Sequence, residues 1–318
     1  MDLTQPLQLN PECRDYVWGG NRLRPGQRIA EAWVVYEQDQ IVSGPFAGRT
    51  LAEVAAEHGA DLLGKRVIQR TGTRFPLLIK LLDCAQWLSI QVHPNDEQAA
   101  RLEGPGTFGK TEAWHVLEAA PEARLIAGLV PGTPVQALAE SIRSGKILDW
   151  AQYLSVRTGD TMFIRPGTLH ALGPGLMIYE VQQTSDITYR VFDWNRPQTA
   201  GRVLHIDKSL AVADPSATVE PKPLPSMCDG DRQVLAECSY FTLEMITAQS
   251  REAELDTLGE TFHALTVVEG AANISVCDAS LTLSRFESVV IPAACGAYRV
   301  RPLGNARILK ASVESIQE

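Results

Sequence analysis

Short apolar runs, separated by glycines and prolines, dominate the chain. Many of them are rich in β-branched and aromatic residues, a pattern that is typical of strands. The clearest runs lie at residues 32–36, 75–79, 177–181, 241–246, 265–268, 272–276, 281–283, 289–291 and 306–309. Because many short strands with few helices characterise β-barrels and β-sandwiches, the pattern predicts a mainly β protein and argues against a parallel βαβ sheet.

Three helix starts stand out against this background. Thr50 opens the sequence TLAE and Asn95 opens NDEQ, and both have the spacing of a capping box. Thr133 is followed by a proline at the first helical position, which also favours a helix start. The pattern therefore predicts a few helices among the strands, at approximately 51–64, 95–103 and 134–154, the last as one helix or a pair.

One segment reads as a linker between two domains. Residues 213–231 (ADPSATVEPKPLPSMCDGD) hold four prolines and few apolar residues, so they favour an extended chain over a helix or strand. We therefore expect an N-terminal domain at 1–212, a linker at 213–231 and a C-terminal domain at 232–318.

The composition excludes several classes of protein. The 318 residues are 45% hydrophobic and 21% charged, as expected for a globular protein, and the formal net charge is −9. An acidic balance argues against binding to nucleic acid or to an anionic membrane, although it allows a small anionic substrate. The most apolar stretch, 75–92, is interrupted by Lys80, Asp83 and Gln86, so we expect no membrane span.

The cysteines and the N-terminus both indicate a cytoplasmic location. The six cysteines are scattered without a C-x-x-C pair, and we expect reduced, mostly buried thiols. The N-terminal residues lack the basic start and apolar core of a signal peptide, so a cytoplasmic location is expected. No G-x-G-x-x-G motif or P-loop is present, and binding of dinucleotides or nucleoside triphosphates has no support.

Three histidine settings could carry chemistry. His93 follows Gln91 by two positions, so on a strand both side chains share a face. Glu112 lies three residues before His115, and His170 ends a segment that begins with a Gly-Asp turn at position 159. Two imidazoles with a carboxylate suit a divalent transition metal. A lone histidine is more often structural, so the metal hypothesis depends on the set.

The segment 159–170 carries a recognisable pattern. A turn, a buried strand at 161–164 and a second turn at Pro166-Gly167 precede His170, and we expect a hairpin that aims this imidazole into a barrel. The spacing resembles the second metal-binding motif of the cupin superfamily. Arg165 stands where that motif has proline, with the glycine-to-histidine count intact.

Motifs along almost the whole chain resemble one family. They lie at 15–20 (DYVWGG), 29–33 (IAEAW), 75–80 (FPLLIK), 88–94 (LSIQVHP), 109–114 (GKTEAW), 159–170, 180–190 (EVQQTSDITYR) and 191–194 (VFDW). The sequence resembles type I mannose-6-phosphate isomerase (phosphomannose isomerase) in its short bacterial form. The Q-V-H-P and K-x-E-A-W elements carry most of the specificity. His115 departs from the family, which more often has an aromatic residue there.

The resemblance implies a fold and a metal site. It implies two cupin (jelly-roll) β-barrels with a few added helices, and one Zn²⁺ per chain in the N-terminal barrel. The implied ligands are His93, Glu112 and His170, with Gln91 as a less certain fourth, and Arg190 is the implied catalytic arginine. The C-terminal part looks like a degenerate cupin without metal, because the position that matches His170 there is Ala297.

The implied reaction interconverts mannose 6-phosphate and fructose 6-phosphate through an enediol. It needs an electrophile for the developing negative charge, a base near C1 and C2, and a cationic cradle for phosphate. The candidates for catalysis are Arg190 and Lys110. Those for phosphate contacts are Ser89, Lys80, Lys110 and Arg190. The base stays open among Lys110, His115, Glu180 and a metal-bound water, and Asp186 and Asp193 are candidates to orient Arg190.

Alternative functions remain. Two histidines and one carboxylate also form the site of non-haem iron cupin oxygenases. A noncatalytic cupin that senses sugar phosphates would keep the fold without turnover, and an isomerase of a related sugar is a third alternative. In each case the expected partner is a small molecule, with no nucleic acid and no membrane, and the chain is expected to be a monomer or a homodimer.

Overall fold

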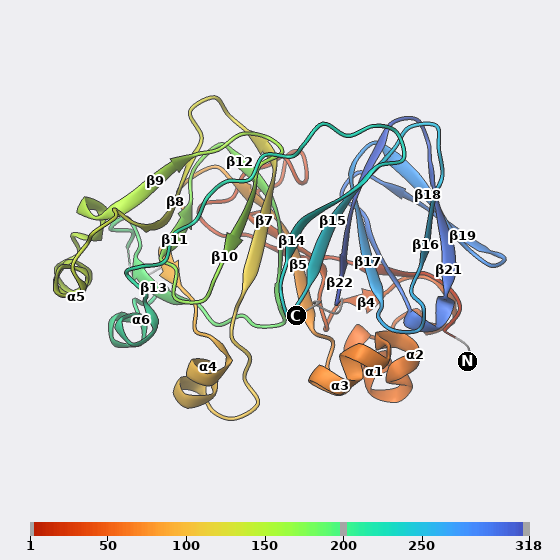
Figure 1. Ribbon diagram of the computed structural model, residues 1–318, viewed down its shortest axis with the longest axis horizontal. Helices are drawn as coiled ribbons and strands as arrows, with labels where there is room; N and C mark the ends of the chain where they lie inside the picture. The colour runs from red at the N-terminus through yellow and green to blue at the C-terminus, as the bar shows by residue number, and fades with distance from the viewer. Residues whose placement is uncertain (1–2, 198–201, 314–318) are drawn as a thin grey trace. The chain divides into compact units, whose positions relative to one another are not determined.

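The computed structural model describes residues 3–197 and 202–313, which form two compact units. Unit 1 comprises Met1–Cys13, Ala32–Leu81 and Leu224–Glu318, and unit 2 comprises Arg14–Glu31 and Leu82–Pro223 (Figure 1). The chain therefore passes between the units several times. These passages fall within or beside β2 (Glu12–Arg14), β3 (Glu31–Val35) and β5 (Leu77–Cys84).

This division differs from the contiguous domains expected from the sequence, which stay a prediction. Residues 1–13 and 32–81 cluster with the C-terminal part of the chain and not with the rest of 1–212. Strand pairing links them, since β1 (Leu7–Asn10) pairs with β20 (Ser288–Ile291) in the register Leu7 to Val290 and also with β4 (Gln40–Ile41). The last passage between the units, after Pro223, falls within the expected linker 213–231.

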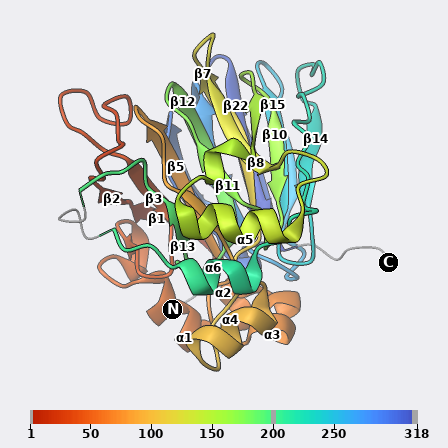
Figure 2. The same ribbon diagram turned by 90° about the vertical axis from the view of Figure 1, so that its left-hand side faces the viewer.

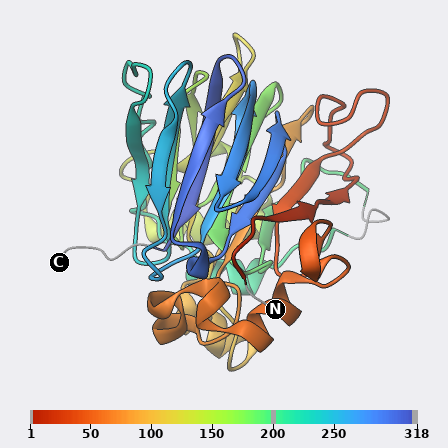
Figure 3. The same ribbon diagram turned by 90° about the vertical axis from the view of Figure 1, so that its right-hand side faces the viewer.

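Unit 1 contains two antiparallel sheets that share one apolar core, together with most of β3 and β5, which belong to the six-stranded sheet β10-β7-β12-β5-β3-β2. The seven-stranded sheet has the order β14-β15-β22-β17-β20-β1-β4 and the four-stranded sheet has the order β16-β21-β18-β19. Side chains from both sheets form the core, which includes Ile246, Val267, Ile274 and Val300. The remaining strands are β4 (Gln40–Ile41), β14 (Arg232–Glu237), β15 (Thr242–Ala248), β16 (Ala253–Asp256), β17 (His263–Glu269), β18 (Ala271–Val276), β19 (Ala279–Ser284), β21 (Ala297–Pro302) and β22 (Ala306–Ser312). Figure 3 shows the strands of residues 232–312 side by side.

Unit 2 repeats this plan with different strands. A ladder of β10 (Thr161–Ile164), β7 (Glu112–Ala119) and β12 (Leu176–Gln183) faces a five-stranded sheet of order β13-β6-β11-β8-β9. Their shared core includes Trp114, Met162, Leu125 and Leu172. The strands of the second sheet are β6 (Ile90–Val92), β8 (Arg124–Leu129), β9 (Ala151–Ser155), β11 (His170–Leu172) and β13 (Tyr189–Phe192).

Helices cover the outer face of the five-stranded sheet in unit 2. α5 (Val135–Ser144) and α6 (Ile206–Val212) lie side by side over it (Figure 2). A second apolar cluster fills this layer, with Ile142 and Val212 from the helices against Val92, Ile126 and Ala171 from the strands. Alternate residues on the strands of this sheet therefore point into the layer under the helices. The residues between them point to the inner face, toward the ladder of β10, β7 and β12.

The helix predictions hold in part. Both capping boxes form, at the starts of α1 (Leu51–His58) and α4 (Asp96–Glu103). The predicted helix 51–64 is interrupted at Gly59 and continues as α2 (Ala60–Leu63), and α3 (Lys65–Thr71) follows unpredicted. The predicted 134–154 holds as a pair of helices, α5 and the short 3-10 helix η2 (Ile147–Asp149), because Gly145 ends α5 in a left-handed conformation. It is wrong at 151–154, which lie in strand β9.

The hairpin expected before His170 is a crossing between sheets. β10 pairs with β7, whereas β11 pairs with β6 and β8 in the facing sheet. The turn at 165–168 therefore carries the chain from one layer to the other. Unit 1 repeats the arrangement, since β20 and β21 lie in different sheets and the short 3-10 helix η4 (Ala293–Cys295) lies between them.

The fold class agrees with the expectation of a mainly β protein with two jelly-roll units. The strand ladders do not close into rings over residues 3–197 and 202–313, so each unit is a sandwich of two sheets. A further 3-10 helix, η1 (Gly44–Phe46), precedes α1. None of the described helices is long and apolar enough to cross a membrane. The expectation of mostly buried cysteines is wrong, because Cys13, Cys228 and Cys277 are exposed.

Candidate metal centre and substrate site

The inner face of β6 presents polar side chains. Ile90 and Val92 point into the layer under the helices, so Gln91 and His93 point the other way, toward the facing sheet. The ring nitrogen Nδ1 of His93 donates a hydrogen bond to the backbone carbonyl of Ile187 at 2.8 Å. This bond fixes the ring and leaves Nε2 facing the interior of unit 2.

Glu112 begins the facing strand β7. Trp114 and Val116 on the same face of β7 belong to the inner core, so Glu112 also points inward, and its side chain is fully buried. His115 lies on the opposite face, where Nδ1 is 2.9 Å from Oγ1 of Thr161. His115 therefore points away from Glu112, which removes it from the candidates for the catalytic base.

His170 is the first residue of β11 and lies across the ladder from Gln91. Its Nδ1 donates to the carbonyl of Thr168 at 2.9 Å, and its ring packs edge-on against Trp114 at 5.2 Å between centroids. Burial lowers the pKa of His170 to about 4, and the positive charge of Lys110 acts in the same direction. The imidazole is therefore neutral near pH 7, which is the form that binds metals.

These three side chains come together at one point. His170 Nε2 lies 3.2 Å from Oε1 of Glu112, and His93 Nε2 lies 3.7 Å from Oε2. Within the described part of the chain, His93, Glu112 and His170 form the one group of three or more such residues that could hold a metal ion, with ligand atoms within 4.8 Å of one another. The backbone bonds at both Nδ1 atoms leave both Nε2 atoms turned to the carboxylate, an arrangement that suits a divalent metal.

Gln91 and Lys110 complete the inner part of the site. The side-chain nitrogen of Gln91 is 3.3 Å from His170 Nε2, so an amide flip would place its oxygen there. Lys110 Nζ lies 2.7 Å from Glu112, 3.1 Å from His93 Nε2 and 3.9 Å from Glu180. A buried ammonium is thus held directly beside the potential metal ligands.

Glu180 lies on β12 next to this cluster. Trp114 Nε1 donates to its Oε2 at 2.9 Å, and the two residues face each other across the β7–β12 ladder. Only 4% of Glu180 is exposed. The indole therefore orients one carboxylate oxygen and leaves the other on the side of Lys110.

Arg190 lies at the opposite edge of the site. It pairs across β13–β6 with Gln91, so Arg190, Gln91 and His170 form a row over three neighbouring strands. Burial lowers the pKa of Arg190, and the positive charge of Arg202 adds to the effect. Nε of Arg190 is buried and makes no hydrogen bond to the described residues.

The remaining residues predicted to bind phosphate or to orient Arg190 do not all lie at this cluster. Ser89 is buried one position before β6 and binds Arg202. Lys80 belongs to unit 1, where Nζ lies 4.9 Å from the ring centroid of Trp33, and its role stays a prediction. Asp186 is exposed. Asp193 is buried and orients other arginines rather than Arg190.

The sequence analysis missed three buried or half-buried polar residues near the site. Gln182 faces Glu112 across the ladder, and its two-residue spacing from Glu180 was the available signal. Arg196 and Arg202 both bind the carboxylate of Asp193, which directly follows β13. No spacing rule predicts that these three side chains meet.

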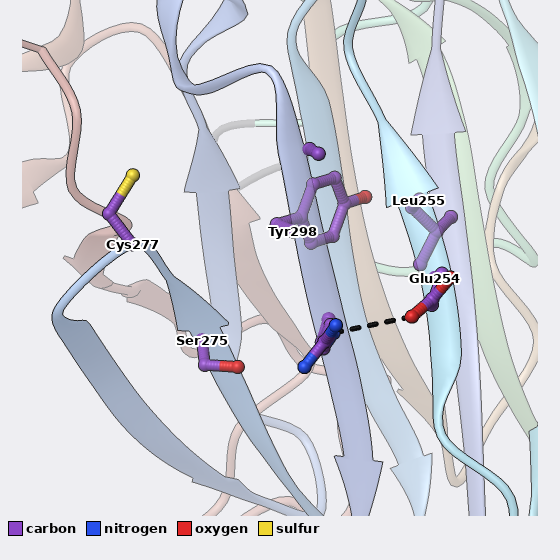
Figure 4. A pocket seen from close by; sticks show the side chains of 7 residues that line it. Glu254, Leu255, Ser275, Cys277 and Tyr298 are labelled. Carbon is purple, nitrogen blue, oxygen red and sulfur yellow. Dashed lines mark ion pairs between the residues drawn. The ribbon is translucent and has the colours of Figure 1, made fainter.

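Unit 1 has a hollow of a different kind. The counted counterpart of His170, Ala297, is exposed, and its inward neighbour Tyr298 binds Nδ1 of His263 at 2.7 Å. A pocket of about 430 Å³ is lined by Glu254, Leu255, Ser275, Cys277, Ala297, Tyr298 and Arg299 (Figure 4). The Glu254–Arg299 ion pair in it is largely exposed, so this pocket lacks the buried charges of the site in unit 2.

The sequence is similar to those of known mannose-6-phosphate isomerases. The model of the phosphomannose isomerase type I catalytic domain matches residues 7–108, which include Ser89, Gln91 and His93. The mannose-6-phosphate isomerase ManA of Bacillus subtilis is 32% identical over 314 residues, covering 93% of this chain and 96% of its own.

Solved structures agree with these sequence matches. The crystal structure of the mannose 6-phosphate isomerase from Bacillus subtilis is 28% identical, with a TM-score of 0.84, over 96% of this chain and 99% of its own. A zinc-bound mannose 6-phosphate isomerase shares the fold at 18% identity, with a TM-score of 0.75 over 96% of this chain and 99% of its own.

Proposed function

The chain belongs to the type I mannose-6-phosphate isomerase family, and we propose that it interconverts mannose 6-phosphate and fructose 6-phosphate with one zinc ion per chain. The observation that carries the proposal is the convergence of His93, Glu112 and His170 in one buried cluster beside Lys110 and Glu180. Similarity to the relatives supports the substrate, and the donor set supports the metal.

The metal would be held by Nε2 of His93, Nε2 of His170 and the carboxylate of Glu112, with the amide oxygen of Gln91 as a fourth ligand. Nitrogen and oxygen donors of this kind suit zinc with a position open to substrate. When bound, the ion would polarise the sugar carbonyl and stabilise negative charge on its oxygen. The expectation of a cytoplasmic enzyme that is a monomer or a homodimer stays a prediction.

The chain's own residues would manage the proton. The isomerisation removes a proton from C2 of the aldose and returns one to C1, through an enediol. Lys110 and Glu180 are the groups whose position fits this exchange, since Nζ of Lys110 lies between the carboxylates of Glu112 and Glu180. Arg190, at the far end of the row, would stabilise the negative oxygen or the phosphate by charge and by paired hydrogen bonds.

Two other functions make different experimental predictions. A noncatalytic sensor would bind sugar phosphate without turnover, whatever metal is supplied. A non-haem iron oxygenase would contain iron and consume oxygen. The buried Lys110 and the half-buried Arg190 favour an anionic sugar over an uncharged oxygenase substrate, so the isomerase is the preferred proposal.

The test is a coupled isomerase assay on mannose 6-phosphate with metal content measured on the same sample. We expect turnover in proportion to bound zinc, loss of activity on exhaustive chelation, and recovery when zinc is returned. Arg190→Ala is expected to keep the metal and the fold while losing most turnover. Full activity of chelated protein that contains no metal would overturn the proposal.

A further inference from the structure

Three guanidinium groups lie near one carboxylate at the end of β13. Asp193, which is 7% exposed, accepts a hydrogen bond from Nη1 of Arg196 at 2.8 Å and another from Nε of Arg202 at 2.7 Å. Arg190 lies close enough to Arg202 for the two positive charges to repel. Three positive charges thus share one buried negative charge, and the exposed carboxylate of Asp186 still leaves a positive excess.

The loop that holds this cluster is strained. Trp194 and Asn195 both have left-handed backbone conformations, with φ of 56° and 53°, and the backbone N–H of Arg196 closes the turn onto the carbonyl of Asp193 at 3.0 Å. Trp194 Nε1 donates to the carbonyl of Leu88 at 2.7 Å. Strain of this kind persists where surrounding contacts fix it, and here it fixes Asp193 beside the segment that leads into β6.

The two arginines bound to Asp193 have different surroundings. Arg196 uses its Nη atoms on Asp193 and on the carbonyl of Trp87, at 2.8 and 2.6 Å, so it joins two loops. Arg202 uses Nε on Asp193 and Nη2 on the hydroxyl of Ser89 at 3.2 Å. A hydroxyl and a guanidinium side by side, with the charge of Arg190 on β13 close enough to interact with Arg202, form an anion-binding arrangement.

The position of Ser89 relates this arrangement to the metal-binding cluster. Ser89 directly precedes β6, so its hydrogen bond with Arg202 links this arrangement to the strand that carries Gln91 and that pairs with Arg190. In a hexose 6-phosphate the reacting carbons C1 and C2 lie at one end of the carbon chain and the phosphate at the other, so separate parts of one site would bind the two ends. The excess positive charge matches a phosphate monoester, which carries between one and two negative charges near neutral pH.

We propose that Arg202, positioned by Asp193 and paired with Ser89, recognises the 6-phosphate of the substrate and selects phosphorylated over free hexoses. The inference rests on the proposed function, because it extends the same site to the far end of the sugar. Arg202 is a specificity residue in this proposal, and Arg196 and Asp193 are positioning residues.

The test compares Arg202→Met with Arg101→Met, a matched change of an exposed arginine on α4. With metal-loaded protein, we expect Arg202→Met to raise the KM for mannose 6-phosphate by about 10- to 100-fold while kcat changes less than about threefold, since lost uniform binding appears in KM. Metal content should equal that of wild type, and Arg101→Met should behave as wild type. An unchanged KM in folded, metal-loaded Arg202→Met would overturn the inference.

Two further measurements keep the result clear. If Arg202→Met does not fold, Arg202→Lys is the second variant, because lysine keeps the positive charge but cannot make the paired hydrogen bonds of a guanidinium. We expect it to raise the KM by less than the 10- to 100-fold expected for Arg202→Met. A double-mutant cycle with Ser89→Ala should give less than additive effects if both residues contact one phosphate. An additive cycle would contradict a shared ligand.

Direct binding separates this inference from the proposed reaction. Fructose 6-phosphate should raise the melting temperature of the metal-loaded wild type, and fructose should not, with the difference lost in Arg202→Met. Protection without any turnover would defeat the isomerase proposal and leave the phosphate site standing. Equal behaviour of fructose 6-phosphate and fructose on the wild type would overturn the phosphate site.

Discussion

Nζ of Lys110 lies 2.7 Å from Oε2 of Glu112, closer to this carboxylate than either candidate metal-binding imidazole. The ammonium is 3% exposed at the residue level, so the attraction is little screened by water. A divalent ion bound by Glu112 would be repelled by this ammonium at short range. We therefore expect Lys110 to lower the affinity of the cluster for metal, in addition to the role in proton transfer that we propose for it.

Lys110→Met separates these two effects. We expect kcat to fall by about 100-fold or more, because a positioned proton-transfer group is lost. Zinc affinity is expected to rise by up to about tenfold, because the like charge is removed. A chelator competition titration measures the affinity, and the coupled assay measures kcat. Weaker zinc binding in the variant would show that Lys110 supports the ligands instead of competing for them.

Two buried histidines of unit 2, His170 on β11 and His115 on β7, provide a matched pair, because only His170 faces the candidate metal centre. His170→Asn is expected to weaken zinc binding by more than about 100-fold, because it removes a ligand nitrogen and its backbone-bonded ring. His115→Asn changes the same residue type at similar burial on the outer face of β7, and we expect normal zinc content. Metal analysis of both proteins after dialysis makes the comparison. Equal metal loss in the two variants would contradict the site.

Alternation along single strands was readable from the sequence. The spacing of Gln91 and His93 predicts a shared face, and the structure shows that face turned inward because Ile90 and Val92 fill the layer under the helices. Both capping boxes also form as predicted, since they depend on contacts within four residues. Features that depend on contacts between residues close in sequence, such as strand alternation and helix capping, were therefore predicted correctly.

Contacts between distant segments were not readable in this way. The pairing of Leu7 with Val290 places the first strand in unit 1, and no local pattern identifies that partner. The chain from β10 to β11 changes sheet, although the turn residues there also fit a hairpin. Arg202 binds Asp193, nine positions earlier in the chain, and no local pattern predicts that contact. The candidate metal ligands were proposed as a set through the family resemblance, which carries information on distant contacts that spacing lacks.

The glycine pair in the N-terminal motif has a packing role that the structure explains. A methyl group added at Gly20 would lie 2.4 Å from Oδ2 of Asp83. That carboxylate, which is 1% exposed, binds the backbone N–H and Nε of Arg22, both at 2.7 Å. The space beside Gly20 is therefore filled by the buried carboxylate of Asp83, which the exposed Arg22 holds in place.

Gly20→Ala is expected to lower the free energy of unfolding by about 2–3 kcal/mol, through overpacking and disturbance of a buried charge. Gly26→Ala is the control, because its φ of +81° brings left-handed strain while no heavy atom lies within 4 Å of the added carbon. That variant should lose only about 1 kcal/mol. Urea denaturation of both proteins measures the difference, and similar losses would rule out the packing explanation.

Asp39 makes stability depend on pH. It is 3% exposed in the turn before β4, and burial raises its pKa to about 8, with the charge of Glu12 acting in the same direction. The ordinary value is 3.8, so between about pH 4 and pH 8 the folded protein holds a proton that the unfolded chain releases. The free energy of unfolding therefore falls as pH rises through this range, by at most about 1.4 kcal/mol per pH unit from this group.

Asp39→Asn removes the ionisable group and keeps its shape. We expect the variant to gain stability relative to wild type as pH rises from 5 to 8, because the asparagine side chain never has to hold a buried negative charge. Asp278→Asn, at an exposed position between β18 and β19, should leave the difference from wild type constant over the same range. Urea denaturation at pH 5, 6.5 and 8 tests this. Parallel stability profiles for wild type and Asp39→Asn would mean that Asp39 is ionised in the folded protein across the range, and that its buried charge is stabilised by its surroundings.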